Sequence, residues 1–279
     1  MFYIFKKLRF LGIIFKNNKK IDSNSTFSLF LTYVKLLMKL TAFKFLHVKY
    51  TEENIFKYKI FFFDYEVFVA LFESIFIENE YYFPSKISSP FIIDVGSNIG
   101  LSILYFKYLF PDAKIIGFEP DPQTFALLKK TIQVNMFTNI KLYELAISSK
   151  KAKAYFYNDR LNPGSVLMSL KEERSPKNRI SVETDTLPHY IGKGLDLLKM
   201  DVEGEEEKII FNLFKNGSLK KIKYMIFEYH HHIVISDDSF SKVLEILEKE
   251  RFGYQIVTKL RSPIEKFLFQ DILVYAKRK

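Results

Sequence analysis

Apolar residues along the chain follow two alternating spacings, which predict strands that alternate with helices over most of the sequence. Short segments rich in apolar residues, typical of buried strands, lie at 91–95, 114–119, 141–147, 195–202 and 223–229. Apolar positions with helical spacing lie between and after these runs, at 98–109, 122–135, 204–216 and 238–251. Because parallel neighbours need crossover connections, the alternation predicts an α/β fold with a mostly parallel sheet and helices on both faces.

Two further pairs of predicted strands belong to this region. Residues 152–157 and 179–183 predict extra strands on either side of a loop at 158–178, which is rich in Asn, Pro, Gly, Ser and charged residues. Residues 254–259 and 267–275 predict an antiparallel C-terminal strand pair that closes the sheet.

The first 88 residues follow a different pattern and predict an N-terminal extension. Apolar positions have helical spacing over 1–50, and the Ile-, Phe- and Tyr-rich segment 55–63 predicts a strand of a hairpin. A further helix is predicted at 66–79, and the Pro- and Ser-rich segment 84–90 marks a boundary. We therefore expect two units, a helical and hairpin extension at 1–88 and a core domain at 89–279.

Length and composition favour a folded protein. The chain has 279 residues, 48% of them hydrophobic, which is enough for one large α/β domain and an accessory segment and argues against disorder. It contains no cysteine, which excludes a disulfide framework, a thiolate zinc site and a thiol nucleophile. This fits a reducing compartment, and we expect a cytoplasmic protein.

The formal net charge of +10 allows two interpretations. It can indicate an anionic partner, such as a membrane surface, a phosphorylated glycan or nucleic acid, or it can reflect a genome that favours lysine codons. The basic residues are scattered and no RNA-binding signature is present, so no nucleic-acid partner is expected.

The first predicted helix is amphipathic and basic. Four apolar residues share one of its faces and three basic residues lie off that face: Ile4, Leu8, Leu11 and Phe15, and Lys7, Arg9 and Lys16. Such a helix either rests on an anionic membrane surface, peripheral to its inner face, or packs against the protein's own core. No segment approaches the ~20 apolar residues of a membrane span.

A glycine-rich turn follows the first core strand, in the sequence Asp94-Val-Gly96-Ser97-Asn98-Ile-Gly100. Glycine lets backbone approach a ligand where a β-carbon would collide. The next strand ends at Glu119, where a carboxylate can accept both hydroxyls of a ribose. This arrangement is typical of a nucleotide-type cofactor site at the carboxyl end of a parallel sheet. The G-x-G-x-x-G spacing of dinucleotide sites is absent, which disfavours an oxidoreductase of the Rossmann type.

The turn resembles motif I of the class I S-adenosylmethionine (SAM) methyltransferases. A second segment, Asp196-Leu-Leu-Lys-Met-Asp-Val-Glu-Gly-Glu-Glu206, resembles the signature of the FkbM-type methyltransferases. The resemblance continues through Thr184-Asp-Thr-Leu-Pro upstream and Met225-Ile-Phe-Glu-Tyr-His230 downstream, and it covers roughly residues 70–235. It implies a Rossmann-like class I methyltransferase fold that uses SAM as methyl donor.

The resemblance also implies roles for the cofactor site. Asp94 would orient the methionine amino group of SAM, Glu119 would bind the ribose hydroxyls, and Ala146 would face the adenine ring. The loop around the methionyl and ribose parts would be formed by Gly96, Ser97, Asn98 and Gly100. Asp121 either helps at the adenine side or caps the next helix, and the alternative for Glu119 is a solvated carboxylate without a role.

The FkbM-type signature carries the predicted catalytic residues. Asp201 and Glu203 are two apart, so on a strand both would point toward the pocket floor, where Lys199 could pair with a carboxylate. Glu205 and Glu206 fall in the first turn of a helix, which favours anions.

His230 is the candidate base, as a neutral imidazole, and a loop histidine without a role is its alternative. Three consecutive histidines begin at this position, but adjacent residues rarely converge on one ion, and no metal site is predicted.

These observations predict a SAM-dependent methyltransferase that acts on a hydroxyl of a sugar, a glycan or a related small molecule. The N-terminal segment and the 158–178 loop are expected to cover the acceptor. A methyltransferase with a non-sugar acceptor and a non-catalytic scaffold protein of the same fold are the alternatives. The amino-methylating signature of nucleic-acid methyltransferases is absent after the fourth strand, where Asp201-Val-Glu-Gly stands instead.

Overall fold

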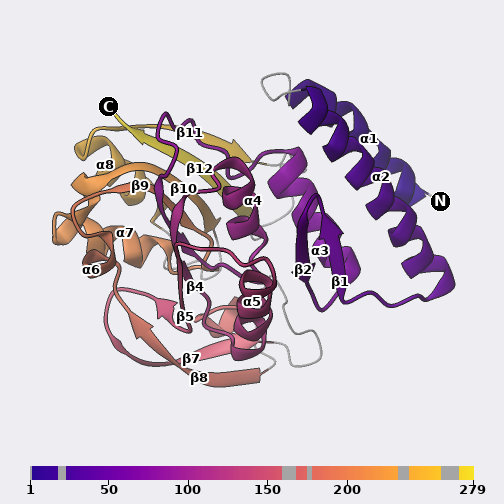
Figure 1. Ribbon diagram of the computed structural model, residues 1–279. Helices are drawn as coiled ribbons and strands as arrows, with labels where there is room; N and C mark the ends of the chain where they lie inside the picture. Colours follow the sequence, from indigo (N-terminus) through magenta and orange to yellow (C-terminus); the bar gives the residue numbers. More distant parts are fainter. Residues whose placement is uncertain (1, 18–22, 159–167, 175–177, 232–238, 259–269) are drawn as a thin grey trace.

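A seven-stranded, mostly parallel sheet forms the centre of the molecule (Figure 1). The computed structural model describes residues 2–17, 23–158, 168–174, 178–231, 239–258 and 270–279. The strand order is β11-β12-β10-β9-β3-β4-β5, with antiparallel pairing only where β12 meets β10 and β11. The strands are β3 (Phe91–Val95), β4 (Lys114–Phe118), β5 (Ile140–Tyr143), β9 (Leu195–Met200), β10 (Ile222–His231), β11 (Phe252–Thr258) and β12 (Gln270–Arg278). This confirms the predicted class I methyltransferase fold with its antiparallel C-terminal pair.

Alternating side chains of the central strands bury both faces of the sheet. Ile92 of β3 belongs to one hydrophobic core and the adjacent Ile93 belongs to the other. The first core contains α4 (Leu101–Leu109) and α5 (Pro122–Val134). The second contains α6 (Pro188–Ile191), α7 (Glu206–Lys215) and α8 (Phe240–Lys249). Two covered faces explain why the central strands are rich in apolar residues.

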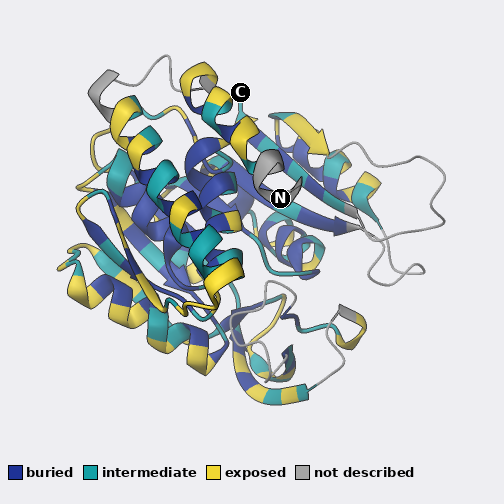
Figure 2. Cartoon of the chain, turned by 90° about the vertical axis from the view of Figure 1, so that its right-hand side faces the viewer, coloured by how far each residue is buried: buried dark blue, intermediate teal, exposed yellow. Residues whose placement is uncertain are grey.

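The N-terminal segment packs onto the first of these cores. It consists of helices α1 (Phe2–Asn17), α2 (Ser23–Leu46) and α3 (Tyr65–Phe72), the hairpin β1 (Glu52–Ile55) and β2 (Tyr58–Phe61), and a π-helical turn η1 (Glu73–Ile77). Phe10, Tyr33 and Phe68 share this core with Phe106 of α4. Helices α1 and α2 lie side by side at the edge of the molecule (Figure 1), and exposed positions follow their outward face (Figure 2). Within the described ranges, every helix is too short or too polar to cross a membrane.

A small second sheet lies beside the ends of β4 and β5. Its order is β6-β8-β7, with β6 (Ala146–Ile147), β7 (Ala152–Asn158) and β8 (Asn178–Asp185). The sequence predicts one strand over 141–147, and this is wrong. The chain leaves the large sheet after Tyr143, and Ala146 and Ile147 pair with β8 instead. The extra strands predicted on either side of the loop are present as β7 and β8.

The predicted end of the fourth core strand is also wrong. Strand β9 ends at Met200 rather than at 202, and α7 begins at Glu206 rather than at 204. Glu203 has φ 55° and Gly204 has φ 112°, so a tight turn replaces the last extended residues. This turn contains Asp201 and Glu203, two of the predicted catalytic residues.

Candidate active site

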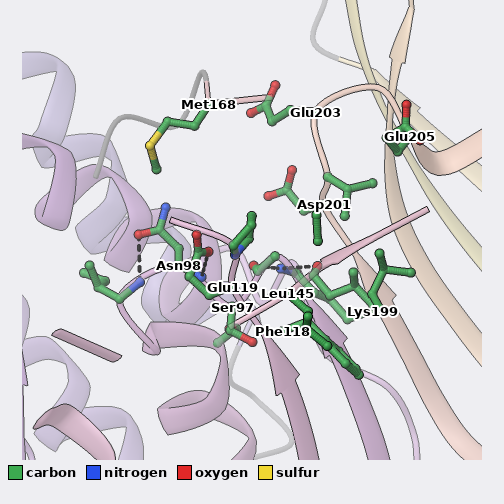
Figure 3. Close-up of a pocket in the computed structure, with 18 of the residues that line it drawn as sticks. Ser97, Asn98, Phe118, Glu119, Leu145, Met168, Lys199, Asp201, Glu203 and Glu205 are labelled. Atoms are coloured by element: carbon green, nitrogen blue, oxygen red, sulfur yellow. Dashed lines mark hydrogen bonds between the residues drawn. The ribbon is translucent and has the colours of Figure 1, made fainter. Parts of the chain in front are cut away.

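A cavity lies where β3, β4 and β9 end (Figure 3). Its polar wall includes Ser97 and Asn98 after β3, Glu119 after β4, and Asp201 and Glu203 after β9. Its apolar wall includes residues from two distant parts of the chain, with Leu71, Ile75 and Tyr81 from the N-terminal segment and Phe156, Met168 and Leu170 from the region around β7. Ligands of open α/β sheets bind at this end of the strands, which makes the cavity the candidate active site.

The glycine-rich turn is held against the turn after β9. Gly96 has φ 79°, and a β-carbon at this position would lie 1.9 Å from the carbonyl oxygen of Asp201. The backbone N–H of Asp201 donates to the carbonyl of Val95 at 3.0 Å. Gly100, with φ 91°, precedes α4 and leaves room for Leu128, whose Cδ1 would be 2.8 Å from a β-carbon. Gly96 is therefore required by packing and Gly100 by its backbone conformation, whatever ligand the turn holds.

Glu119 is buried in the cavity wall and is oriented by the backbone. Its Oε2 accepts the N–H of Asn98 at 3.0 Å, and its Oε1 accepts the N–H of Asp121 at 3.0 Å. Burial raises the pKa of Glu119 to about 8. A carboxylate oxygen has two acceptor positions, so each oxygen can still accept one hydroxyl from a ligand.

Asp94 and Lys199 form a buried ion pair between β3 and β9. Lys199 Nζ lies 3.1 Å from Asp94 Oδ1 and donates to the carbonyl of Gly96 at 2.6 Å. Asp94 Oδ2 accepts the hydroxyl of Ser102 at 2.6 Å. Burial alone would lower the pKa of Lys199, but Asp94 and Asp201 outweigh it and raise the pKa. Lys199 thus stays charged, and its hydrogen bond to the carbonyl of Gly96 stabilises the glycine-rich turn.

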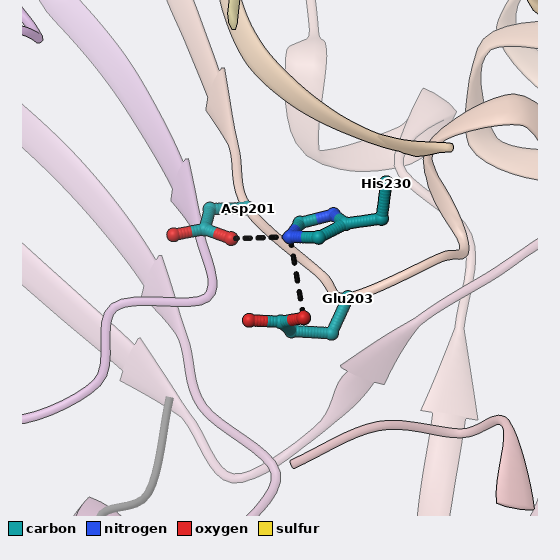
Figure 4. Close-up of side chains that lie close together, drawn as sticks. All are labelled: Asp201, Glu203 and His230. Atoms are coloured by element: carbon teal, nitrogen blue, oxygen red, sulfur yellow. Dashed lines mark ion pairs between the residues drawn. The ribbon is translucent and has the colours of Figure 1, made fainter. Parts of the chain in front are cut away.

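Three side chains meet beside the turn after β9 (Figure 4). His230 Nε2 lies 3.2 Å from Glu203 Oε2 and 3.8 Å from Asp201 Oδ1. His230 Nδ1 lies 2.8 Å from Oε1 of Glu206, whose carboxylate also accepts the N–H groups of Val202 and Gly204. Burial opposes the charge on His230, but Glu206 and Glu203 outweigh it and raise its pKa to about 10. A raised pKa favours the imidazolium at neutral pH, which does not suit the neutral base that the sequence predicts.

The cavity brings together most of the residues that the sequence singles out. Those that line it are Gly96, Ser97, Asn98, Glu119, Ala146, Lys199, Asp201 and Glu203. Those that support the wall without lining it are Asp94, Gly100, Asp121 and His230. Asp121 caps α5 by accepting the N–H of Thr124 at 2.9 Å, as its alternative interpretation expects. His232 and most of the 158–178 loop lie outside the described residues.

Sequence reasoning did not identify several residues of the site. Tyr81 and Met168 line the cavity from segments without a motif, and no local signal marks them. Glu206 was interpreted only as stabilising the helix start, yet its carboxylate holds both His230 and the preceding turn. Only the fold reveals these contacts, because the partners are distant in sequence.

The sequence also matches a family model, described as the methyltransferase FkbM domain, over residues 94–256. The chain belongs to the FkbM methyltransferase domain family. The matched range contains every predicted cofactor-site and catalytic residue from Asp94 to His230. It leaves Leu71, Ile75 and Tyr81 of the cavity wall outside the FkbM domain.

Curated proteins with similar sequences are named methyltransferases. "Methyltransferase sdnD" of Sordaria araneosa is 31% identical over 174 residues, which are 50% of this chain and 66% of that protein. "2-O-methyltransferase NoeI" of Sinorhizobium fredii (strain NBRC 101917 / NGR234) is 29% identical over 157 residues, 50% of this chain and 63% of that protein. The matches thus span just under two thirds of these relatives. A crystal structure of methyltransferase FkbM from Methylobacillus flagellatus KT aligns with a TM-score of 0.49 at 14% identity, over 97% of this chain and 59% of that one.

Proposed function

We propose that the protein transfers a methyl group from SAM to a hydroxyl of a sugar, a glycan or a related small molecule. The observation that carries the proposal is the geometry of Glu119, a buried carboxylate with each oxygen fixed by one backbone N–H at the end of β4. Membership of the FkbM family and the name of the 2-O-methyltransferase relative support the reaction type.

The cavity residues fit SAM by their chemistry. Glu119 would accept the two ribose hydroxyls, while Ser97 and Asn98 would surround the ribose and methionyl parts and Ala146 the adenine. Carboxylates of Asp201 and Glu203 in one wall complement a positive sulfonium, and Glu119 adds to this charge when it is deprotonated. Asp94 does not line the cavity, so it would influence the methionine amino group indirectly. It pairs with Lys199, which donates a hydrogen bond to the carbonyl of Gly96 in the glycine-rich turn.

Methyl transfer needs little from the protein beyond alignment and removal of a proton. SAM, when bound, supplies a methyl group that its sulfonium has already activated. Asp201 and Glu203 would orient the acceptor hydroxyl, and one of these two carboxylates would take its proton as the oxygen attacks. Lys199 is a positioning residue, because its ammonium is directed at Asp94 and the carbonyl of Gly96. The N-terminal wall and the β7 region would cover the acceptor.

Calorimetric titration of the purified chain with SAM and S-adenosylhomocysteine (SAH), with NAD as control, tests this proposal. Micromolar binding of both adenosyl compounds and none of NAD is the expected result. An acceptor screen over sugars and glycolipids then follows, with methyl transfer from labelled SAM as the readout. Failure to bind either adenosyl compound would favour the non-catalytic scaffold protein instead.

We also propose that the N-terminal helices contact an anionic membrane surface. Phe10 and Ile14 of α1 pack into the core, whereas Leu8 and Phe15 are exposed. Exposed apolar side chains continue along α2, at Phe27, Leu31, Met38, Phe45 and Leu46. Arg9 and Lys16 are exposed on α1. A surface that combines apolar side chains with basic ones is typical of peripheral membrane contact, and it would bring a lipid-linked acceptor to the cavity.

A further inference from the structure

Asp201, Glu203 and His230 bring three metal-binding atoms together from two neighbouring segments (Figure 4). The ligand atoms of these side chains all lie within 4.8 Å of one another, and the two distances to His230 Nε2 are 3.2 and 3.8 Å. Metal–ligand bonds of about 2.0–2.2 Å place neighbouring ligand atoms about 3–3.5 Å apart. The two distances to His230 Nε2 are therefore close to the spacing of ligand atoms around one metal ion.

The orientation of His230 points to a cation between these groups. Its Nδ1 lies 2.8 Å from Glu206, a fully buried carboxylate that is itself fixed by two backbone N–H groups. A carboxylate that accepts the Nδ1 proton directs the Nε2 lone pair outward, as in many histidines that bind metals. Here Nε2 faces Glu203 and Asp201, so three acceptors converge. A positive charge among these acceptors would stabilise the arrangement, and a metal ion bound at Nε2 would supply it.

We propose that Asp201, Glu203 and His230 bind one divalent transition-metal ion at the edge of the cavity. One imidazole nitrogen and two carboxylate oxygens suit Mn²⁺ or Zn²⁺ better than Ca²⁺, which prefers oxygen ligands alone. The side chain of His230 is 1% exposed, that of Glu203 13% and that of Asp201 27%, so the site opens through the carboxylates that line the cavity.

The metal ion would have a defined role in the reaction. A hydroxyl bound to a divalent ion has a lowered pKa, so its proton passes more readily to the carboxylates beside it. This role rests on the proposed methyl transfer, whereas metal binding itself does not. The sequence did not predict the site, because only one of its ligands comes from the three consecutive histidines.

A second group of possible metal ligands also contains His230, and it provides an internal control. The ligand atoms of Glu228, His230 and Asp271 also lie within 4.8 Å of one another. Neither Glu228 nor Asp271 lines the cavity, so an ion held there would lie away from the acceptor. Substitutions at Glu203 and at Asp271 therefore separate the two arrangements.

The test uses the full chain, stripped with EDTA and titrated with MnCl₂ while the electron paramagnetic resonance signal of free Mn²⁺ is followed. We expect one ion per chain, and about tenfold or greater weakening in Asp201→Asn and Glu203→Gln. Asp271→Asn should bind Mn²⁺ as the unchanged protein does. Calorimetry with SAH on the same samples separates the two proposals, because loss of SAH binding with retained Mn²⁺ binding would overturn the proposed function alone.

Two results would overturn the metal site. If neither Mn²⁺ nor ZnCl₂, titrated calorimetrically, binds at millimolar concentration while SAH does, the cluster holds a proton and His230 is a structural imidazolium. If Asp271→Asn abolishes Mn²⁺ binding and Glu203→Gln does not, the ion occupies the second arrangement. Thermal unfolding of each variant without metal shows that a loss of binding does not come from a loss of fold.

Discussion

Gly96 and Asp201 lie so close that a β-carbon at position 96 would be 1.9 Å from the Asp201 carbonyl oxygen. The contact joins the turn after β3 to the turn after β9, and the hydrogen bond from Asp201 N to Val95 O, at 3.0 Å, fixes it. The predicted cofactor turn and the turn with the predicted catalytic carboxylates are therefore packed directly against each other. A change in one of these turns has to displace the other.

Gly96→Ala is expected to abolish measurable SAH binding and to destabilise the protein strongly. The left-handed φ of 79° alone would cost an alanine about 1–2 kcal/mol of stability. The collision of its β-carbon with the Asp201 carbonyl oxygen adds to this cost. Calorimetry and urea unfolding measure the two effects. Gly217→Ala is the matched control, since Gly217 has φ 72° and a β-carbon there would meet nothing within 4 Å. Equal effects of the two substitutions would mean that the contact with Asp201 has no importance of its own.

The sequence predicted the elements that follow from local pattern. Strand β3 agrees residue for residue, because a five-residue segment with four apolar residues, bounded by Pro90 and Gly96, has clear ends. The end of β9 was placed too late, because Val202 and Glu203 continue the strand-like pattern although Glu203 adopts φ 55°. A non-glycine residue at positive φ carries no sequence signal, so the turn that directs Glu203 toward His230 could not be predicted.

Glu119 is expected to make cofactor binding depend on pH. Its pKa of about 8 means that the carboxyl group is mostly neutral at pH 7, yet accepting two ribose hydroxyls favours the carboxylate. The affinity for SAH should therefore rise from pH 6 and level off above about 8, by up to about tenfold per pH unit. Calorimetry across this range measures the slope. Glu119→Gln should bind more weakly at pH 9 and without this slope, whereas Glu144→Gln, an exposed control, should keep it.

The raised pKa of Glu119 also predicts how the stability of the protein changes with pH. The pKa of Glu119 is higher in the folded protein than its ordinary value of 4.5, so the folded state binds more protons between these two values. The contribution of Glu119 to stability is therefore present below about pH 4.5 and lost as the pH rises toward about 8. In the absence of ligand, the free energy of unfolding of Glu119→Gln is compared with that of the unchanged protein. The difference should shift in favour of the variant as the pH rises from 5 to 9. A constant difference across that range would contradict the raised pKa.

Lys199 is expected to matter more for folding than for chemistry. Lys199→Met leaves Asp94 as an uncompensated buried charge, which costs about 3–5 kcal/mol in urea unfolding. The double variant Lys199→Met/Asp94→Asn removes that charge and should lose less than the sum of the single changes. Lys223→Met is the control, because Lys223 pairs with Asp196 but its side chain is 59% exposed, against 2% for Lys199. Its cost should stay below about 1 kcal/mol. Additive effects at Lys199 and Asp94 would show that the two residues act independently.

The sequence predicted that Lys199 would pair with a carboxylate, but it did not identify which one. Positions two apart suggested Asp201, whereas parallel pairing of β3 with β9 sets Asp94 opposite Lys199. Strand register depends on the assembled sheet, so a contact between neighbouring strands cannot be deduced from spacing within one of them. The same limit applies to Leu71, Ile75 and Tyr81, which reach the cavity only because the N-terminal segment packs on α4.

The exposed apolar side chains of α2 are expected to carry membrane contact. Leu31→Gln/Met38→Gln changes two exposed residues, so it should leave the fold intact and weaken sedimentation with vesicles that contain phosphatidylglycerol. Binding should also fall with added salt, because the basic charge contributes through screened attraction. Met136→Gln is the control, since Met136 is exposed outside the two helices. If the unchanged protein does not sediment with these vesicles, or if Met136→Gln weakens binding equally, α1 and α2 do not form a specific membrane surface and their exposed side chains need another partner.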